Sequence, residues 1–302
     1  MATKKDNTDT AQEVGAGEAF PGDTPTGTAV GRAQSTAVST DVMSFEEDGG
    51  SEFAMDDVSI PFIVILQALS PQCDKQNPAY IQGAEPGMIL NTATGQFWSG
   101  ETGVLVLVIS HQRRFTEWWP RNSKKGKGLV NDYGSDRELA TSKVLDLQSY
   151  PWMTKDETSI IEAGMYYVML VDDSGMPVRG VLNLQGTQLK KYKQLNTLMQ
   201  SWMLRSPKTG RAFNPPTFAR TYRMRTVPER NDQGNWYGFK FEPGPALGKT
   251  GDDFLDQHLL PNGGELYMAA KLFRDQVHAG DVIVAQPMSE AEAAPANEEA
   301  PF

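Results

Sequence analysis

Apolar residues concentrate in the middle of this chain, and both ends are polar. Residues 1–55 are rich in Gly, Thr, Ala, Ser, Asp and Glu and contain few aromatic residues, so they cannot bury enough apolar surface to offset the entropy lost on ordering. Residues 286–302 are also polar and acidic and show no periodicity. We therefore predict two disordered acidic arms flanking one folded core, residues 56–285.

The first half of this core is predicted to be extended or looped. The apolar run VSIPFIVILQAL, residues 58–69, fits either a buried helix or a buried strand. Residues 69–96 are studded with Pro, Gly and Asn, which indicates turns around short extended pieces. VLVLVIS, residues 104–110, reads as a buried strand, and RRFTEWW, residues 113–119, alternates as a second extended piece.

Two hairpins are predicted from paired β-rich runs. The first joins residues 165–171 to residues 178–184 through the sequence DDSG. The second joins residues 218–227 to residues 235–242 through the turn-rich sequence PERNDQG. Consecutive hairpins favour an antiparallel sheet, and closure into a full or partly open barrel is one way to protect its edges.

Two helices are predicted in the second half of the chain. TQLKKYKQLNTLMQSWML, residues 187–204, places Thr187 as the N-cap and puts its apolar side chains on one face, as expected for a helix packed on a sheet. ELYMAAKLFRDQV, residues 265–277, is a last helix, and VIVA, residues 282–285, is a short strand. The predicted fold class is thus β-rich α+β, with helices inserted into an antiparallel sheet.

The net charge of −10 argues against nucleic acid until its distribution is considered. Residues 1–57 carry a net charge of −9 and residues 286–302 a net charge of −4, which leaves about +3 for residues 58–285. The chain therefore has acidic ends and a mildly basic core.

Other features of the composition exclude several classes. The N-terminus lacks the apolar stretch of a secretory signal, and no run reaches the roughly 20 apolar residues of a membrane helix. We expect a cytoplasmic protein with no membrane partner. Cys73 is the single cysteine, and the three histidines lack zinc-type spacing, so no soft-ligand metal site is expected.

One basic segment, residues 113–128, combines six cations with a single acid, Glu117, and interleaves aromatic rings. Single-stranded nucleic acid needs cations along its phosphates and flat side chains under its bases. Adjacent Trp118 and Trp119 should point to opposite faces of a strand, so at most one of them is expected to face the core. The predicted DNA-binding residues of this segment are Arg113, Arg114, Phe115, Trp118, Trp119, Arg121, Lys124, Lys125 and Lys127. The alternative is a solvated basic loop beside core tryptophans.

A second basic and aromatic segment is the predicted hairpin around residues 218–241. Residues 205–230 carry seven basic side chains and one acid, beginning with Arg205, Lys208 and Arg211. Its predicted DNA-binding residues are Arg220, Tyr222, Arg223, Arg225, Trp236 and Tyr237. The alternative is a twisted hairpin whose arginines are merely solvated, since aromatic strand residues are common in any β core.

Two further patterns are weak. PGPALGKT, residues 243–250, resembles a phosphate loop, but Pro243 stands where that motif needs glycine. The acids and histidine of residues 252–258 suggest a metal site, but they are equally typical of a polar turn. No nucleophile elbow, Cys–His pairing or His-Glu-x-x-His motif is present. We therefore expect no enzymatic activity, no cofactor and no bound metal.

The chain ends in PANEEAPF, an acidic tip that closes with a free phenylalanine carboxylate. Such a tip can mimic the phosphate chain and cover a basic site in cis, or it can offer its ring to an apolar pocket of another protein. The predicted partner-binding residues are Glu298, Glu299, Pro301 and Phe302.

This tip, together with the basic β core, resembles the single-stranded-DNA-binding proteins of bacteria and bacteriophages. The resemblance implies an OB-fold-like barrel, binding of single strands without strong sequence preference, homodimerisation, and recruitment of replication, recombination or repair enzymes through the tail. The sequence departs from that family in its thin acidic tip, its long acidic N-terminal arm, and a core larger than a minimal OB-fold. A helix at 187–204 and an insertion at 113–164 are expected to account for the excess.

Two competing hypotheses remain. One is a phage structural or assembly protein whose acidic arms mediate capsid or scaffold contacts. The other is a metal-dependent nuclease that uses the acids of residues 252–258.

Overall fold

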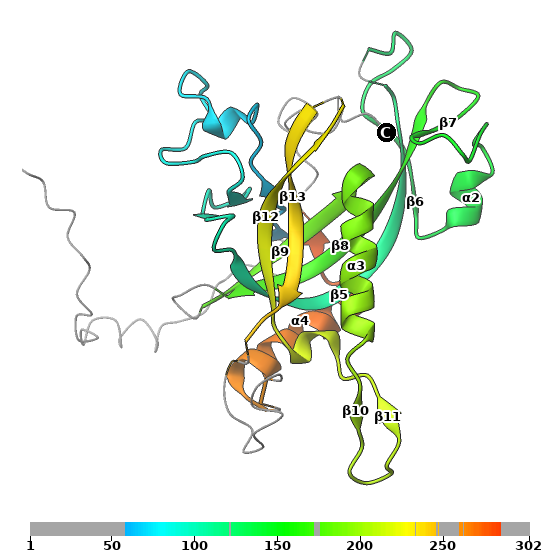
Figure 1. The fold of residues 1–302 in the computed structure, drawn as a ribbon. Coiled ribbons are helices and arrows are strands. Elements are labelled where there is room, and N and C mark those ends of the chain that lie inside the picture. The colour runs from blue at the N-terminus through cyan, green and yellow to red at the C-terminus, as the bar shows by residue number, and fades with distance from the viewer. Residues whose placement is uncertain are drawn as a thin grey trace, which may run out of the picture. The chain divides into compact units, whose positions relative to one another are not determined.

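The fold is organised around one long strand, β5 (Val104–Trp118), in a seven-stranded sheet (Figure 1). The computed structural model describes residues 58–284 except 121, 172–175, 233, 246, 248–259 and 262. The two predicted arms lie outside these residues, as do most of residues 243–262 that carry the weak phosphate-loop and metal patterns. The predicted β-rich class is confirmed.

β5 and β8 (Ser159–Val171) pair antiparallel over most of their length. On its other edge, each of these two strands pairs with two shorter strands, one after the other. On β5, β12 (Tyr222–Asn231) pairs with residues 104–106 and β6 (Leu129–Gly134) pairs with residues 115–118. On β8, β7 (Trp152–Met153) and β9 (Pro177–Gln185) divide the edge in the same way. β13 (Gly234–Pro243) pairs with β12, so both predicted hairpins and the antiparallel arrangement are confirmed.

The two extended pieces predicted at 104–110 and 113–119 form a single strand. Its register against β8 shifts between Val108 and Ser110, which is the mark of a β-bulge. Val108 and Ile109 at this bulge are both buried, because a separate core covers each face of the sheet there. The exposed residues His111 and Gln112 remain paired with β8, which is why the strand continues through a polar stretch.

Among the described residues the sheet does not close into a barrel, because no ladder joins β9 to β13. The segment 61–67 lies along both edges instead. On β9, the Val181 N–H donates to the Pro61 carbonyl at 2.8 Å. On β13, the side-chain amide of Gln67 accepts from Tyr237 N at 2.8 Å and donates to Tyr237 O at 2.9 Å.

Short strands organise the remainder of the N-terminal half. The apolar run 58–69 forms β1 (Ser59–Ile60) and β2 (Ile63–Ile65), not a helix. β2 pairs antiparallel with β3 (Ile89–Asn91), and β3 with β4 (Phe97–Trp98). β1 pairs in parallel with β14 (Ile283–Val284), the short strand predicted at 282–285. Residues 69–88 are turns around a short 3-10 helix, η2 (Pro71–Cys73), as predicted.

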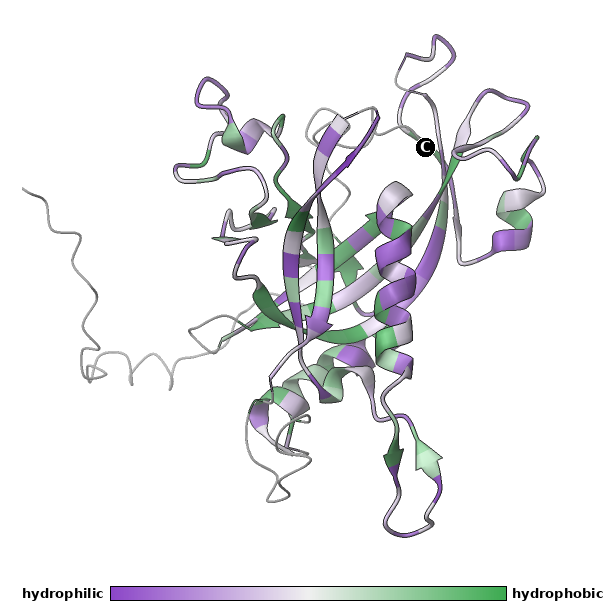
Figure 2. Cartoon of the chain, in the orientation of Figure 1, coloured by the Kyte–Doolittle hydropathy of each residue, from purple (hydrophilic) through white to green (hydrophobic). Residues whose placement is uncertain are grey.

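Alternation along β5 divides the apolar residues into two main cores. Val104, Val106 and Val108 face a core that is covered by α3 (Leu189–Gln200). Leu107 and Ile109 face a second core that is covered by α4 (Glu265–Ala279). Figure 2 shows that the strands at the centre are largely hydrophobic, whereas α3 presents hydrophilic residues away from the sheet. The predicted packing of an amphipathic helix on the sheet is confirmed.

The boundaries of the helix predicted at 187–204 differ from the prediction. A 3-10 turn, η3 (Gly186–Gln188), precedes α3, so Thr187 is not at the boundary and the N-cap is Gln188, which makes no side-chain capping bond. The carbonyl of that Gln188 side chain instead accepts from Phe239 N at 2.9 Å, on the outer edge of β13. At the C-terminus, the amide of Asn214 donates to the carbonyl of Gln200, and the chain leaves the helix.

Several smaller elements were not predicted, among them β6 and β7. A short helix, α2 (Arg137–Thr141), lies between β6 and β7 and is N-capped by Asp136. A small hairpin of β10 (Leu204–Arg205) and β11 (Ala212–Phe213) follows α3, and a 3-10 turn, η4 (Thr217–Ala219), leads into β12. None of the helices in the described part of the chain has the length and apolar character of a membrane span.

Candidate nucleic-acid interface

The first predicted DNA-binding segment occupies the C-terminal half of β5 and the loop that follows it. Arg113, Phe115 and Glu117 alternate with Arg114 and Trp118, so the two sets lie on opposite faces of the sheet. The residues predicted in this strand therefore do not share one surface.

Phe115 belongs to a third, small core at this end of the sheet. It is fully buried and packs parallel to the Trp152 ring, with the ring centroids 6.2 Å apart. Tyr133 from β6, Ala140 from α2 and Ile160 from β8 complete this core. A ring with no exposed surface cannot receive a base, so the DNA-binding role predicted for Phe115 is not supported by its placement.

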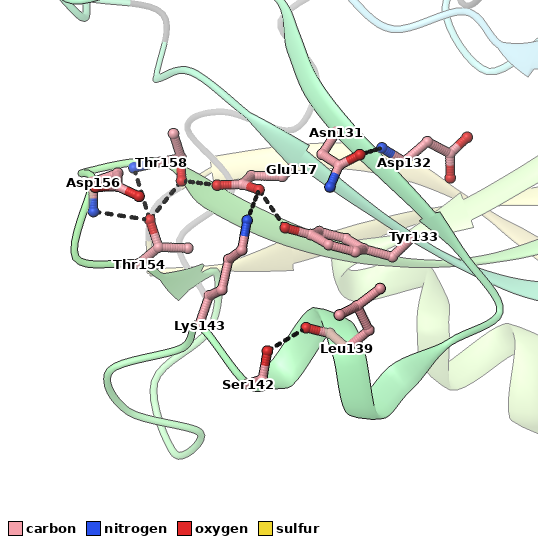
Figure 3. A network of polar contacts seen from close by, with 10 residues as sticks. All are labelled: Glu117, Asn131, Asp132, Tyr133, Leu139, Ser142, Lys143, Thr154, Asp156 and Thr158. Carbon is pink, nitrogen blue, oxygen red and sulfur yellow. Dashed lines mark hydrogen bonds and ion pairs between the residues drawn. The ribbon is translucent and has the colours of Figure 1, made fainter.

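Glu117 reaches past this core into a network of polar side chains (Figure 3). Its side chain is 3% exposed, and its carboxylate accepts hydrogen bonds from Thr158 Oγ1 and Tyr133 OH, each at 2.5 Å. The Lys143 ammonium lies 3.7 Å from the same carboxylate, and the Thr158 hydroxyl also contacts Thr154 Oγ1 at 2.5 Å. The single acid of the basic segment is thus a buried anchor that joins β5, β6 and the 143–158 segment.

The network determines the charge of Glu117. Burial on its own raises the pKa of this carboxyl, but the hydrogen bonds from Thr158 and Tyr133 and the charge of Lys143 outweigh it, so the pKa lies below its usual value. The pKa of Lys143 is raised by its contact with Tyr133 and by the Glu117 charge. Both groups are therefore charged at neutral pH, and the acid is already compensated inside the protein.

An open pocket of about 320 Å³ lies directly above this network. Three lysines from three different segments surround it: Lys125, Lys143 and Lys155. Trp119 and Val130 supply its apolar wall. Lys143 and Lys155 were not among the predicted residues, because they lie in a stretch of sequence with no basic or aromatic clustering and only the fold brings them to Trp119.

The basic loop packs on Trp119. Trp119 N donates to the Gly128 carbonyl at 3.0 Å, which closes the loop. A Cβ atom on Gly126 would lie 2.3 Å from Trp119 Nε1, so only glycine lets the loop backbone lie this close to the indole. Lys124 and Lys127 are exposed, whereas Lys125 is 3.0 Å from Glu157. Arg121, also predicted to bind, lies outside the described residues.

The two arginines of β5 are held by carboxylates of the protein. Arg113 forms an ion pair with Glu162, and Arg114 forms an ion pair with Asp132. The hydrogen bond from Arg114 lowers the pKa of Asp132. Trp118, on the same face as Arg114, is half-buried and donates from Nε1 to Thr116 Oγ1 at 2.9 Å. These side chains are bonded to other residues of the protein, which leaves them less available to a ligand.

In the second predicted segment, two residues are buried. Tyr222 is 1% exposed and lies in the core beneath α3, where burial raises the pKa of its hydroxyl to about 12. Arg220 is 5% exposed, with its guanidinium 4.3 Å from the Trp202 ring centroid and 5.2 Å from that of Tyr222. Their burial gives no support to the predicted DNA contact of these two residues, because little of either side chain reaches the surface.

Arg223 and Arg225 hold a neighbouring turn. Arg223 donates to the Thr102 carbonyl at 3.2 Å, and Arg225 donates to the Glu101 carbonyl at 2.5 Å. Arg225 also lies 3.7 Å from Glu242 on β13. Both arginines therefore fix the turn before β5 against β12.

Trp236 and Tyr237 are half-buried near the tip of the β12–β13 hairpin. Trp236 Nε1 donates to Glu229 at 2.9 Å. The Tyr237 ring covers Gly87, where a Cβ atom would lie 2.7 Å from the ring. Their rings are thus engaged within the protein.

The fold does not bring the two predicted segments together. Arg223 is paired with Leu105 at the start of β5, whereas Trp118 ends that strand. At about 3.3 Å per residue, the 13 residues between positions 105 and 118 span roughly 40 Å along the strand. Of the predicted residues, Trp119 and Lys125 line one pocket, together with Lys143 and Lys155, while Lys124 and Lys127 are exposed on the adjoining loop. The predicted tail residues Glu298, Glu299, Pro301 and Phe302 lie outside the described residues.

Fold and site together define a β-rich protein whose antiparallel sheet carries a lysine-lined pocket at one end. The family model described as Pam3 phage gp34-like protein matches residues 30–283, and the chain belongs to this phage family. This match supports the phage origin predicted from the sequence, and it ends before the acidic tip. No curated protein and no solved structure matches the chain.

Proposed function

We propose that this phage protein binds single-stranded DNA at the pocket formed by Trp119, Lys125, Lys143 and Lys155. It coats and protects the strand without strong sequence preference, and its acidic C-terminal tail recruits replication or recombination enzymes. The observation that carries the proposal is the pocket itself, in which three ammonium groups surround one partly exposed indole. Phosphate groups bind to cations, and an unstacked base stacks on a flat ring.

The buried carboxylate favours this use of the pocket. Two carboxylates line the pocket: Glu117 accepts two hydrogen bonds and has Lys143 beside it, whereas the exposed Asp156 is offset, within the described residues, only by the surrounding lysines. Lys155 and the loop residues Lys124 and Lys127 have no ion-pair partner within the described part of the chain. These cations can therefore bind phosphate without first breaking an internal contact.

The order of the strands also supports the proposal, which includes an OB-fold-like core. β5 is followed, after an insertion that holds β6, α2 and β7, by β8 and β9. α3 comes later in the chain, and the β12–β13 hairpin then places β12 beside β5. In OB-folds the loop between the first two strands is one of the elements that bind oligonucleotides. Here the corresponding connection, residues 119–158, carries the pocket. The unpaired edges of β9 and β13 make this a partly open version.

One observation favours the alternative function, a phage structural or assembly protein. Arg113, Arg114 and Arg225 are all neutralised by carboxylates of the same chain, which leaves fewer cations than the sequence implied. A scaffold role predicts large symmetric assemblies without DNA and no response to single strands. Light scattering of the free protein distinguishes the two proposals.

The test is a titration of the full chain with oligo-dT, followed by tryptophan fluorescence. We expect quenching and an affinity that falls steeply with salt. Replacing Lys125 and Lys155 with Gln should weaken binding and reduce the salt slope by about 1.4, which is about 0.7 for each lost phosphate contact. Deleting residues 286–302 should tighten binding, whereas removing Phe302 alone should leave DNA affinity unchanged and reduce partner binding.

The matched control replaces Lys75 and Lys271 with Gln, because both are exposed and lie on other elements. It makes the same change in net charge and should retain nearly full affinity. Absence of quenching at low salt, or an equal loss in the control, would overturn the proposed function.

A further inference from the structure

A second basic element stands apart from the pocket, in the β10–β11 hairpin. Figure 1 shows this hairpin projecting away from the sheet, beyond the end of α3. Its two strands pair Leu204 with Phe213 and Arg205 with Ala212. Every residue from 207 to 214 is exposed, so the tip touches little of the rest of the protein.

The charge of this hairpin is entirely positive. Residues 201–217 contain Arg205, Lys208 and Arg211 and no acid. All three side chains are exposed, and none has an ion-pair partner among the described residues. Figure 2 shows hydrophilic residues around the tip and hydrophobic ones in the two strands. The three charges of this hairpin thus face solvent uncompensated, unlike those of Arg113 and Arg114.

The hairpin is also held in a defined shape. At its tip, Ser206 N donates to the Arg211 carbonyl at 2.9 Å and Gly210 N donates to the Ser206 carbonyl at 2.8 Å. Gly210 has φ +66°, a left-handed conformation that favours glycine. Arg205 Nη1 donates to the Gly210 carbonyl at 3.2 Å, which directs its guanidinium along the tip.

The root of the hairpin is fixed to the body. The Asn214 amide donates to the carbonyls of Gln200 and Trp202, at 2.9 Å and 2.8 Å. The Trp202 ring packs on the buried guanidinium of Arg220. A projecting arm that is ordered before it meets a ligand loses less conformational entropy on binding.

From these observations we propose that the 204–213 hairpin is a second nucleic-acid contact, which binds the phosphate backbone of double-stranded DNA. It is separate from the pocket and does not depend on single-strand binding there. Duplex is the occupant that its chemistry fits. Its three cations lie at residues 205–211, whereas its one aromatic ring, the exposed Phe213, is paired with Leu204 at the root, so the tip offers phosphate contacts and no platform for an unstacked base. A two-stranded ribbon also has the width that the major groove of B-DNA, about 12 Å wide, admits.

The experiment compares the full chain with the triple variant Arg205→Gln, Lys208→Gln, Arg211→Gln. Each protein is titrated with a short blunt duplex and with oligo-dT over a range of salt concentrations. We expect the triple variant to lose duplex affinity and to lower the duplex salt slope by about 2.7, which is about 0.9 for each lost phosphate contact. Oligo-dT binding should change little.

The matched control replaces Lys75, Lys240 and Lys271 with Gln, which removes the same charge from exposed positions elsewhere. Its duplex affinity should stay near that of the unaltered chain. The proposal is overturned if the triple variant binds duplex normally, if the control loses as much, or if only oligo-dT binding falls. The last outcome would assign the hairpin to single strands. Retained oligo-dT quenching in the triple variant separates this test from a failure of the proposed pocket.

Discussion

Two segments of this protein look alike in sequence, and the fold uses them in opposite ways. Residues 113–128 and residues 218–241 both mix arginine or lysine with aromatic rings. At the end of β5, Trp119 and its lysines border an open pocket. At the start of β12, Tyr222 is buried, Arg220 just before the strand is buried against the Trp202 ring, and the next two arginines donate to backbone carbonyls.

The difference comes from what lies next to each segment. Residues 119–128 follow the end of a strand and have only a loop around them, so their charges reach solvent. At residues 222–224, β12 pairs with both β13 and β5. Tyr222 and Met224 therefore enter the core beneath α3, and Arg223 and Arg225 find acceptors on neighbouring segments. Among the described residues, basic and aromatic composition therefore gives exposed, unpaired cations where the chain leaves the sheet, as at Lys124 and Lys127.

The largest expected effect is on stability, at Tyr222. Tyr222→Ala removes a ring that is 1% exposed, and we expect the free energy of unfolding to fall by about 3–5 kcal/mol. Tyr222→Phe keeps the ring and should be far less damaging. Urea unfolding measures both. If the folded Tyr222→Phe variant bound oligo-dT much more weakly, Tyr222 would be a binding residue after all and the contrast between the two segments would fail.

An intermediate effect is expected on binding, at Trp119. Trp119→Leu removes the stacking surface while keeping an apolar side chain under Gly126, and should weaken oligo-dT binding by about 1–3 kcal/mol. Trp118→Leu is the matched control on the neighbouring position, since the Trp118 indole is bonded to Thr116. Fluorescence anisotropy of labelled oligo-dT provides the measurement. Equal losses in both variants would show that the pocket has no special role.

The smallest expected effect is a pH dependence at Glu117. The folded protein holds the pKa of Glu117 below the ordinary value of 4.5, so its carboxylate stabilises the fold fully above about that pH and loses this contribution as the pH falls through the folded-state pKa. Glu117→Gln should cost about 1 kcal/mol at neutral pH, the net worth of one hydrogen bond. The difference in unfolding free energy between this variant and the unaltered chain should become smaller as the pH falls. Urea unfolding at several pH values measures this difference, and a difference that grows as the pH falls would contradict the network in Figure 3.

Much of the fold could be predicted because it follows from local patterns. The β8–β9 and β12–β13 hairpins and α4 were all indicated by alternation, turn residues or helical periodicity. The continuity of β5 could not, since it depends on a bulge and on pairing with β8 through exposed His111 and Gln112. β6, α2 and β7 were missed because their stability comes from contacts with distant residues such as Phe115 and Ile160.

The site was less predictable than the fold. Trp119 and the loop lysines were identified from sequence, since they are contiguous. Lys143 and Lys155 lie 24 and 36 positions after Trp119, and only the closure of the 119–158 connection brings them to it. Conversely, Phe115 and Tyr222 were predicted to bind DNA although the strand's alternation sends them inward. Which face of a strand is buried is decided by the elements that pack on it, and sequence alone did not reveal them.

The glutamine contacts on β13 have a consequence for how the protein behaves at high concentration. An unpaired strand edge is a template on which another chain can add a strand, and this is a common start of aggregation. Here Gln67 occupies both backbone groups of Tyr237, and Gln188 occupies the Phe239 N–H. Within the described part of the chain no strand covers this edge, but two side-chain amides occupy its backbone groups. The partly open sheet is therefore protected from pairing with a strand of another molecule.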